Sequence, residues 1–131
     1  MPAIKVVFYQ EESGFVPVMD WLLTDVLRTD KKLFAWCFDA IEQLAERGYQ
    51  LQRPTAAPLR AGLYELRIRY YHQNYRILYF FHEGAAAVLT HGLVKEQRVP
   101  ESEIKVALER KRRFQANPEA HTYYEEARTN Q

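Results

Sequence analysis

The stretch that decides the fold is GLYELRIRYYHQNYRILYFF, residues 62–81. In its first half the apolar side chains fall at every second position, which places them on one face of a β-strand: Tyr64, Leu66, Ile68 and Tyr70. The alternate positions face the other way and are polar: Glu65, Arg67 and Arg69. His72-Gln73-Asn74 then predicts a polar turn, and Tyr75 to Phe81 is a second aromatic and aliphatic run. The stretch therefore predicts an antiparallel hairpin with one apolar face and one arginine-bearing face.

Elements on both sides extend this hairpin into a sheet. A turn at Glu83-Gly84 leads into residues 85–93, which predict a third antiparallel strand and hence a three-stranded meander. Near the start of the chain, residues 4–9 are β-branched and aromatic and predict a fourth strand. The segment 51–62 contains two prolines and shows no period, so it predicts a surface loop.

Three helices are expected around this sheet. Apolar residues recur at helical spacing from Val16 to Leu27 and again from Leu33 to Ala45. Thr29-Asp30 separates these two helices and supplies a cap, and Gly48 ends the second helix. Residues 101–114 predict a third, amphipathic helix with a basic end.

The element order predicts an α+β domain: an antiparallel sheet of about four strands with two N-terminal helices and one C-terminal helix. A chain of 131 residues supports one core of this size, so residues 1–117 are interpreted as a single domain. The helices are expected to cover one face of the sheet, which leaves the face with Glu65, Arg67 and Arg69 open. Residues 118–131 form a polar tail, expected either as a frayed end or as a short docking helix.

The charge distribution reveals a basic middle. The net charge is only +1, but residues 53–113 hold twelve Lys/Arg against six Asp/Glu, and both flanking segments are acidic. A phosphate-rich partner and a solvated face of mixed charge both fit this pattern. No stretch approaches the roughly 18 apolar residues of a membrane span, so we expect a cytoplasmic protein with no membrane partner. Cys37 lies between Trp36 and Phe38 and is expected to be packed in the core.

Conventional catalytic signatures are missing from the sequence. The four histidines lack the paired spacing of a zinc site: His72, His82, His91 and His121. The glycines are isolated and provide no phosphate-binding loop, so we expect neither a metal nor a cofactor. What remains is the arginine face of the hairpin with its interleaved tyrosines. This composition suits single-stranded RNA, because guanidinium groups pair with phosphate and aromatic rings stack on bases. Ordinary strand composition is the alternative interpretation.

Four blocks in a fixed order carry a family resemblance. They are Gly62 to Arg67, Tyr75 to Tyr79, His91 to Lys95 and Pro100 to Ile104. Together they resemble the block pattern of phage-derived HigB-like toxins in the RelE/ParE superfamily. The strand-helix-helix opening matches the superfamily order, and the resemblance is strongest over residues 62–113.

The resemblance implies an endoribonuclease that cleaves messenger RNA at the ribosome without a metal ion. In such a reaction a ribose 2′-hydroxyl attacks the scissile phosphate, and basic side chains stabilise the charge that develops on the phosphorane. The catalytic residues implied by the resemblance are Arg67, Arg76 and Lys95. The residues expected to contact RNA beside them are Arg69, Arg98, Tyr71 and His72.

The sequence departs from the family pattern at Glu96, where the family has the second lysine of a pair. Three interpretations stay open: Glu96 points away from the phosphate, acts as a general base, or weakens the nuclease, and Arg98 can restore the charge. The general base is therefore unassigned, with His72 and Tyr71 as candidates by location. His91, by strand parity with Ala87, Leu89 and Leu93, is expected to be a hydrogen-bonded residue in or near the core rather than an acid or base.

Two further basic features have two interpretations each. Arg69 either contacts the phosphate backbone of the RNA or pairs with Glu65. The run from Arg110 to Arg113 either contacts ribosomal RNA or completes a helix end, where cations suit the negative dipole.

The resemblance also implies partners. They are messenger RNA, the ribosome and a cognate helix-turn-helix antitoxin in a hetero-oligomer, and an acidic antitoxin segment is expected to cover the arginine face. Two other functions remain open. One is a toxin of the same fold that binds DNA gyrase, as ParE-like relatives do, and the other is a degenerate, non-catalytic protein that only binds the antitoxin.

Overall fold

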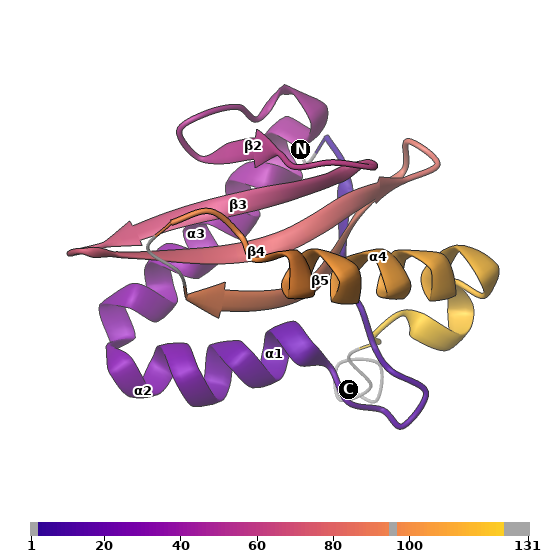
Figure 1. The fold of residues 1–131 in the computed structure, drawn as a ribbon, viewed down its shortest axis with the longest axis horizontal. Helices are drawn as coiled ribbons and strands as arrows, with labels where there is room; N and C mark the ends of the chain where they lie inside the picture. Colours follow the sequence, from indigo (N-terminus) through magenta and orange to yellow (C-terminus); the bar gives the residue numbers. More distant parts are fainter. Residues whose placement is uncertain (1–2, 95–96, 125–131) are drawn as a thin grey trace, which may run out of the picture.

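A five-stranded mixed sheet forms the centre of the molecule (Figure 1). The computed structural model describes residues 3–94 and 97–124. The sheet has the order β1-β5-β4-β3-β2 and consists of β1 (Lys5–Phe8), β2 (Ala56–Pro58), β3 (Leu63–Tyr70), β4 (Gln73–His82) and β5 (Ala86–Val94). Neighbouring strands are antiparallel except β1 and β5, which are parallel. The predicted α+β class is confirmed, with one strand more than expected and one parallel pairing.

Strand β3 pairs with β4 along its whole length, from Leu63 opposite Phe80 to Tyr70 opposite Gln73. The connecting turn is Tyr71-His72, and β4 begins at Gln73, so the turn is shorter than expected. Tyr71 has a φ of 56°, a left-handed conformation that costs a residue with a side chain about 1–2 kcal/mol. Its ring packs edge-on against Tyr70, with the ring centroids 4.6 Å apart.

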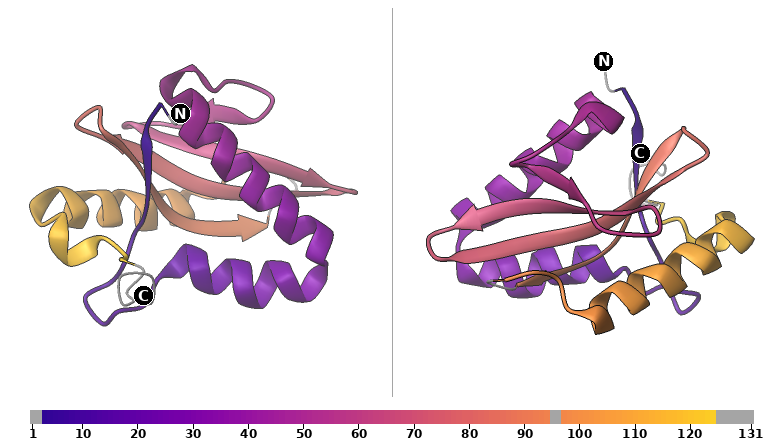
Figure 2. Two further views of the ribbon diagram at one scale, coloured as in Figure 1. Left: turned by 180° about the vertical axis from the view of Figure 1, so that it is seen from behind. Right: turned by 45° about the horizontal axis from the view of Figure 1, so that its top comes forward.

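Helices α1 to α3 lie on one face of the sheet (Figure 2). Their bounds are α1 (Pro17–Trp21), a π-helical segment (Leu22–Val26), α2 (Leu27–Thr29) and α3 (Lys31–Arg47). The first three form one continuous stretch, because the backbone at both junctions is helical. The Asp30 carboxylate caps α3 by accepting a hydrogen bond from the Lys32 N–H at 2.8 Å. Asp30 also accepts from the Tyr70 hydroxyl, which ties the hairpin tip to α3 and lowers the pKa of Asp30.

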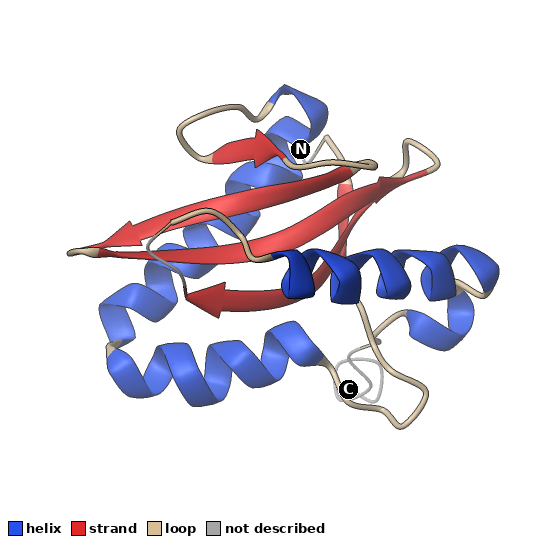
Figure 3. Ribbon diagram, in the orientation of Figure 1, coloured by secondary structure: helices blue, strands red, loops and turns tan. Residues whose placement is uncertain are grey.

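The sheet buries side chains on both faces. The first core lies against α1 to α3 and contains these sheet residues among others: Leu66, Ile68, Ile77 and Leu89. Helix α4 (Glu101–Ala116) lies across the opposite face (Figure 3). There it forms a second core with Leu63, Leu78 and Phe80. The expectation that this face is open is therefore wrong. An amphipathic helix must bury its apolar stripe, and the apolar residues beside the arginines provide the surface for it.

Strand β2 lies within the segment predicted as a loop, so that prediction is wrong for Ala56–Pro58. A three-residue strand is too short to show a period in the sequence. In the pairing of β2 with β3, the backbone groups of Ala56 and Pro58 point away from β3. The hydrogen bonds to β3 are made by the alternate residues, such as Thr55 and Leu59. The Ala56 N–H donates to the Gln52 carbonyl, and proline has no N–H. These two positions therefore offer no donor to a further strand, which protects the sheet edge.

The C-terminal segment packs beside β1. A 3₁₀ turn (Glu119–His121) is followed by an isolated bridge between Tyr9 and Thr122. The His121 ring stacks on the Tyr9 ring with centroids 5.1 Å apart, and its Nδ1 lies 2.8 Å from the Gln10 carbonyl oxygen. Of the two alternatives for the tail, the docked one therefore holds for residues 118–124.

Gly92 of β5 faces Trp21 of α1 so closely that a Cβ at this position would lie 2.3 Å from the indole ring. Gly92→Ala is expected to lower the free energy of unfolding by about 1–3 kcal/mol, because the ring cannot shift without disturbing the first core. Urea denaturation measures the change. Trp21→Leu makes room in the same place, so the double variant should lose less than the sum of the two single losses. A Gly92→Ala protein as stable as the unchanged one contradicts this packing.

Cys37 of α3 is fully buried, which confirms that it is packed in the core, and burial raises the pKa of its thiol to about 12. The thiolate is the reactive form of cysteine, so the native thiol should react very slowly. We expect an aromatic disulfide reagent to label the protein rapidly in urea but only slowly in native buffer. Fast labelling of the folded protein at neutral pH is the result that contradicts this placement.

Candidate functional site

Two arginines lie directly opposite each other in the β3–β4 hairpin. Arg67 of β3 and Arg76 of β4 are register partners, so both side chains leave the same face of the sheet. This is the face of the second core, which also carries Leu78. Like charges in directly opposite positions destabilise a hairpin. A negatively charged group close to both arginines would offset this repulsion.

Glu65 supplies that anion. It precedes Arg67 by two residues on the same strand face, and only 4% of its surface is exposed. Its Oε2 accepts a hydrogen bond from Arg67 Nη2 at 3.2 Å, and its Oε1 lies 2.8 Å from Arg76 Nε. The second contact is an ion pair without hydrogen-bond alignment, since neither atom has a hydrogen-bond partner among the described residues. One carboxylate is thus shared by two guanidinium groups, and the described residues of the cluster carry a net positive charge.

The two arginines differ in how far they reach solvent. The Arg76 side chain is 8% exposed and donates from Nη1 to the carbonyl oxygen of Gln97, in the segment between β5 and α4. The Arg67 side chain is 35% exposed, and its buried Nε has no hydrogen-bond partner within the described ranges. An anion that approaches from solvent can therefore contact Arg67 first, and Arg76 lies deeper in the site.

Arg69 and Arg98 are both exposed cations. Arg69 does not form the ion pair with Glu65 that was one of its two expected roles, because the carboxylate is engaged by Arg67 and Arg76. Arg98 follows the residue whose carbonyl receives the Arg76 hydrogen bond. Both remain candidates for contact with a phosphate backbone.

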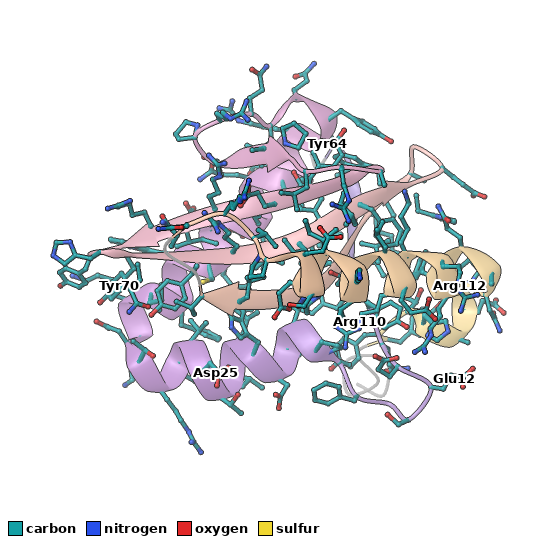
Figure 4. The ribbon with its side chains drawn as sticks, in the orientation of Figure 1. Glu12, Asp25, Tyr64, Tyr70, Arg110 and Arg112 are labelled. Carbon is teal, nitrogen blue, oxygen red and sulfur yellow. The ribbon has the colours of Figure 1, made fainter. Side chains whose placement is uncertain are left out.

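The remaining predicted residues lie at the hairpin tip or outside the described residues. Tyr71 and His72 form the exposed turn that follows Tyr70 in the chain, and Figure 4 labels Tyr70. Lys95 and Glu96 lie outside the described residues. The role of Lys95 and the direction of Glu96 therefore stay predictions.

A comparison with known protein families identifies the family of this chain. The sequence model described as phage derived protein Gp49-like (DUF891) matches residues 25–112, which include Glu65, Arg67 and Arg76. The chain belongs to the Gp49-like family. This family is associated with RelE-type toxins, which agrees at that coarse level with the predicted resemblance. No curated protein matches the chain.

Among the residues that the structure describes, no group of three or more His, Cys, Asp or Glu side chains could hold a metal ion. No helix in residues 3–94 and 97–124 is long and apolar enough to cross a membrane.

His91 lies on the arginine side of the sheet with Leu93, so the expected parity holds for Leu93 but is wrong for Ala87 and Leu89. A β-bulge at Thr90 inserts one residue into β5, and this places His91 opposite Leu78. Its Nε2 lies 2.9 Å from Glu103 Oε1 of α4, and its Nδ1 lies 3.1 Å from Thr90 Oγ1. The predicted hydrogen-bonded position near a core is confirmed, because His91 is buried and links β5 to α4.

The basic run at the end of α4 is bonded within the chain. Its partners are Glu11 for Arg110 and Arg113, Glu109 for Arg112 and Arg113, and the Ala61 carbonyl for Lys111. Figure 4 shows Arg110 on the side of α4 that faces the loop between β1 and α1. Hydrogen bonds to Arg112 and Arg113 lower the pKa of Glu109 to about 2. This pairing favours the helix-end interpretation over contact with ribosomal RNA.

Sequence reasoning missed two members of the site, Glu65 and the Gln97 carbonyl. Glu65 had a signal, since it is a single acidic residue that alternates with arginines on one strand face. The Gln97 contact had none, because the path of a loop over a strand is decided by tertiary packing.

Burial lowers the pKa of His91 below its usual value, although the hydrogen bond to Glu103 acts in the opposite direction. The unfolded chain therefore takes up a proton at higher pH than the folded protein, so stability is lost as pH falls through the ordinary histidine value of 6.5. We expect His91→Asn to reduce the stability loss between about pH 7 and about pH 5, measured by urea denaturation. His72→Asn, in the exposed turn, is the matched control and should leave the pH dependence unchanged. Parallel curves for the unchanged protein and His91→Asn argue against this assignment.

Proposed function

We propose that this Gp49-like protein is the toxin of a toxin–antitoxin module, of the HigB-like branch, and that it cleaves messenger RNA without a metal ion. The observation that carries the proposal is the register pair of Arg67 and Arg76, two like charges that share the Glu65 carboxylate. Such a pair costs stability, and local costs of this kind are typical of functional sites. A site with more guanidinium donors than acceptors suits a phosphate group.

The proposed chemistry uses a nucleophile that belongs to the RNA. The ribose 2′-oxygen attacks the adjacent phosphorus atom, and the bond from phosphorus to the 5′-oxygen breaks. The 2′-hydroxyl gives up its proton and the departing 5′-oxygen takes one up, which leaves a 2′,3′-cyclic phosphate and a 5′-hydroxyl. Negative charge builds up on the phosphoryl oxygens in the transition state. Preorganised guanidinium groups stabilise that charge more strongly than they stabilise the ground state.

We propose different tasks for the basic residues. Arg67 is the proposed direct contact with the scissile phosphate, because its side chain is 35% exposed whereas that of Arg76 is 8% exposed. Arg76 is the proposed inner cation, held by Gln97. The exposed Arg69 and Arg98 are proposed to contact the RNA backbone on either side. Lys95 stays a catalytic candidate on the strength of the resemblance alone.

The hairpin tip is proposed to contact a base. Tyr71 is 76% exposed, and stacking of an unpaired base on such a ring contributes roughly 1–3 kcal/mol. His72 beside it is the candidate for proton transfer, because it lies in the exposed turn between the two strands that carry Arg67 and Arg76.

A helix-turn-helix antitoxin is the proposed partner. An acidic segment of it over Arg67, Arg69 and Arg98 would neutralise the site and compete with RNA. Such a complex should weaken as salt concentration rises, because its charges are solvent-exposed in the free protein.

Arg67→Ala is expected to lower messenger cleavage in a translating extract by about 10²-fold or more, because a cation that stabilises the transition state is lost. Arg76→Ala should have a similar effect. Arg76→Lys is the sharper probe of that position, since it keeps the charge but loses the planar fork. Cleavage is measured by mapping new RNA ends, and thermal unfolding verifies the fold. Arg112→Ala is the matched control, because Arg112 is an exposed arginine bonded to Glu109 on α4.

The alternatives give different results in the same experiments. Inhibition that survives both Arg67→Ala and Arg76→Ala contradicts the nuclease proposal and favours a toxin that acts by binding, for example to DNA gyrase. Normal growth of cells that contain ample soluble protein contradicts both toxin functions. It favours a degenerate protein that only binds the antitoxin.

A further inference from the structure

Glu65 occupies an unusual position for a carboxylate. It is the only acidic residue in β3 and β4, it lies on the arginine face, and it is almost fully buried. A buried carboxylate is costly unless cations or hydrogen-bond donors surround it. Here the surrounding groups are the two arginines assigned above to phosphate binding. The side chain is therefore part of the site itself.

Each oxygen of Glu65 engages a different arginine. Oε2 contacts the outer Arg67, and Oε1 contacts the inner Arg76. A carboxylate shared in this way fixes the separation of the two guanidinium groups, which would otherwise repel each other across the hairpin. The Gln97 carbonyl holds Arg76 from another side. Both cations are thus oriented before any ligand arrives.

The cluster still has spare donors. Arg67 Nε is buried without a hydrogen-bond partner among the described residues, and the Arg76 Nε–H is not aligned with the Glu65 oxygen that it faces. Among the described residues, two guanidinium groups and one carboxylate also leave one positive charge uncompensated. Because 35% of the Arg67 side chain is exposed, a phosphate group can add to the cluster without removing Glu65.

We propose that Glu65 is a positioning residue that holds Arg67 and Arg76 in the arrangement needed for the transition state and that weakens RNA binding in the ground state. This inference rests on the proposed nuclease function. The carboxylate draws on the same two cations as the substrate phosphate, so it reduces electrostatic attraction for RNA. Its benefit is expressed in the transition state, because oriented cations stabilise developing charge without reorganising.

A purely structural ion pair makes a different prediction. If Glu65 only stabilised the fold, its neutral substitution would lower the unfolding midpoint and would reduce RNA binding and cleavage together. If Glu65 is a positioning residue, its neutral substitution instead tightens RNA binding and slows cleavage, so the two measurements change in opposite directions.

The test compares Glu65→Gln with the unchanged protein in two assays. Binding uses a labelled 2′-deoxy oligonucleotide with the sequence of a mapped cleavage site, which cannot react. Cleavage uses the corresponding messenger in a translating extract. Glu65→Gln is expected to bind tighter, with the logarithmic salt slope steeper by roughly 0.7 for one added net charge. It is expected to cleave about 10²-fold more slowly.

Matched variants separate charge from position. Glu101→Gln removes one carboxylate from an exposed pair with Arg60 at the start of α4 and should change neither assay. Glu65→Asp keeps the charge but is too short to reach both arginines, so it should bind as the unchanged protein does and cleave about tenfold more slowly. If Glu65→Gln does not fold, Glu65→Asp decides the question by the same two assays.

Each outcome bears on one of the two proposals. A folded Glu65→Gln that cleaves at the unchanged rate, or that loses binding and cleavage in equal measure, overturns the positioning role alone. A Glu65→Asp protein with an unchanged cleavage rate does the same. If the unchanged protein cleaves no RNA, the nuclease proposal fails and the positioning role fails with it.

Discussion

The register between β3 and β4 is the constraint on which the rest of the structure depends. It directs Leu66 and Ile77 toward α1 to α3 and Leu63 and Leu78 toward α4, so one hairpin contributes to both cores. Side chains alternate with a period of two, so a slip of one residue in one strand would exchange its two faces. Such a slip would bury charge in the first core. The two cores therefore lock the register, and the register places Arg67 opposite Arg76.

The face of the hairpin that carries the arginines has two parts. At the end away from the turn, Leu63 and Phe80 pack against α4 in the second core. Nearer the turn, the same face carries the paired side chains of Arg67 and Arg76. Burial of Arg76 is tolerated because Glu65 and the Gln97 carbonyl surround its guanidinium group. The segment that leads into α4 is thus bonded to the site. Helix α4 is in turn fixed by polar contacts, through Glu103 to His91 and through Arg110 to Glu11.

Several elements were predictable because their signals are local. The cap at Asp30, the stop at Gly48 and the apolar spacing between them define α3 without knowledge of any other element. The alternation in β3 likewise gave the correct grouping of Arg67 with Glu65 on one face. Other features lacked a local signal. β2 is too short to show a period, and the bulge at Thr90 reverses the parity of His91 through a single inserted residue.

The family resemblance singled out Arg67 and Arg76 as the arginines of the candidate site, whereas local pattern along the chain established the α+β class and the helices. The class and the helices follow from short-range periodicity and residue type, which every segment carries by itself. Tertiary structure decided which face α4 covers, which arginine is buried and which carboxylate they share. Those outcomes depend on contacts between segments distant in sequence, such as Arg76 with Gln97 and Arg110 with Glu11. Burial and hydrogen-bond satisfaction are properties of the whole packed chain, so no single segment specifies them.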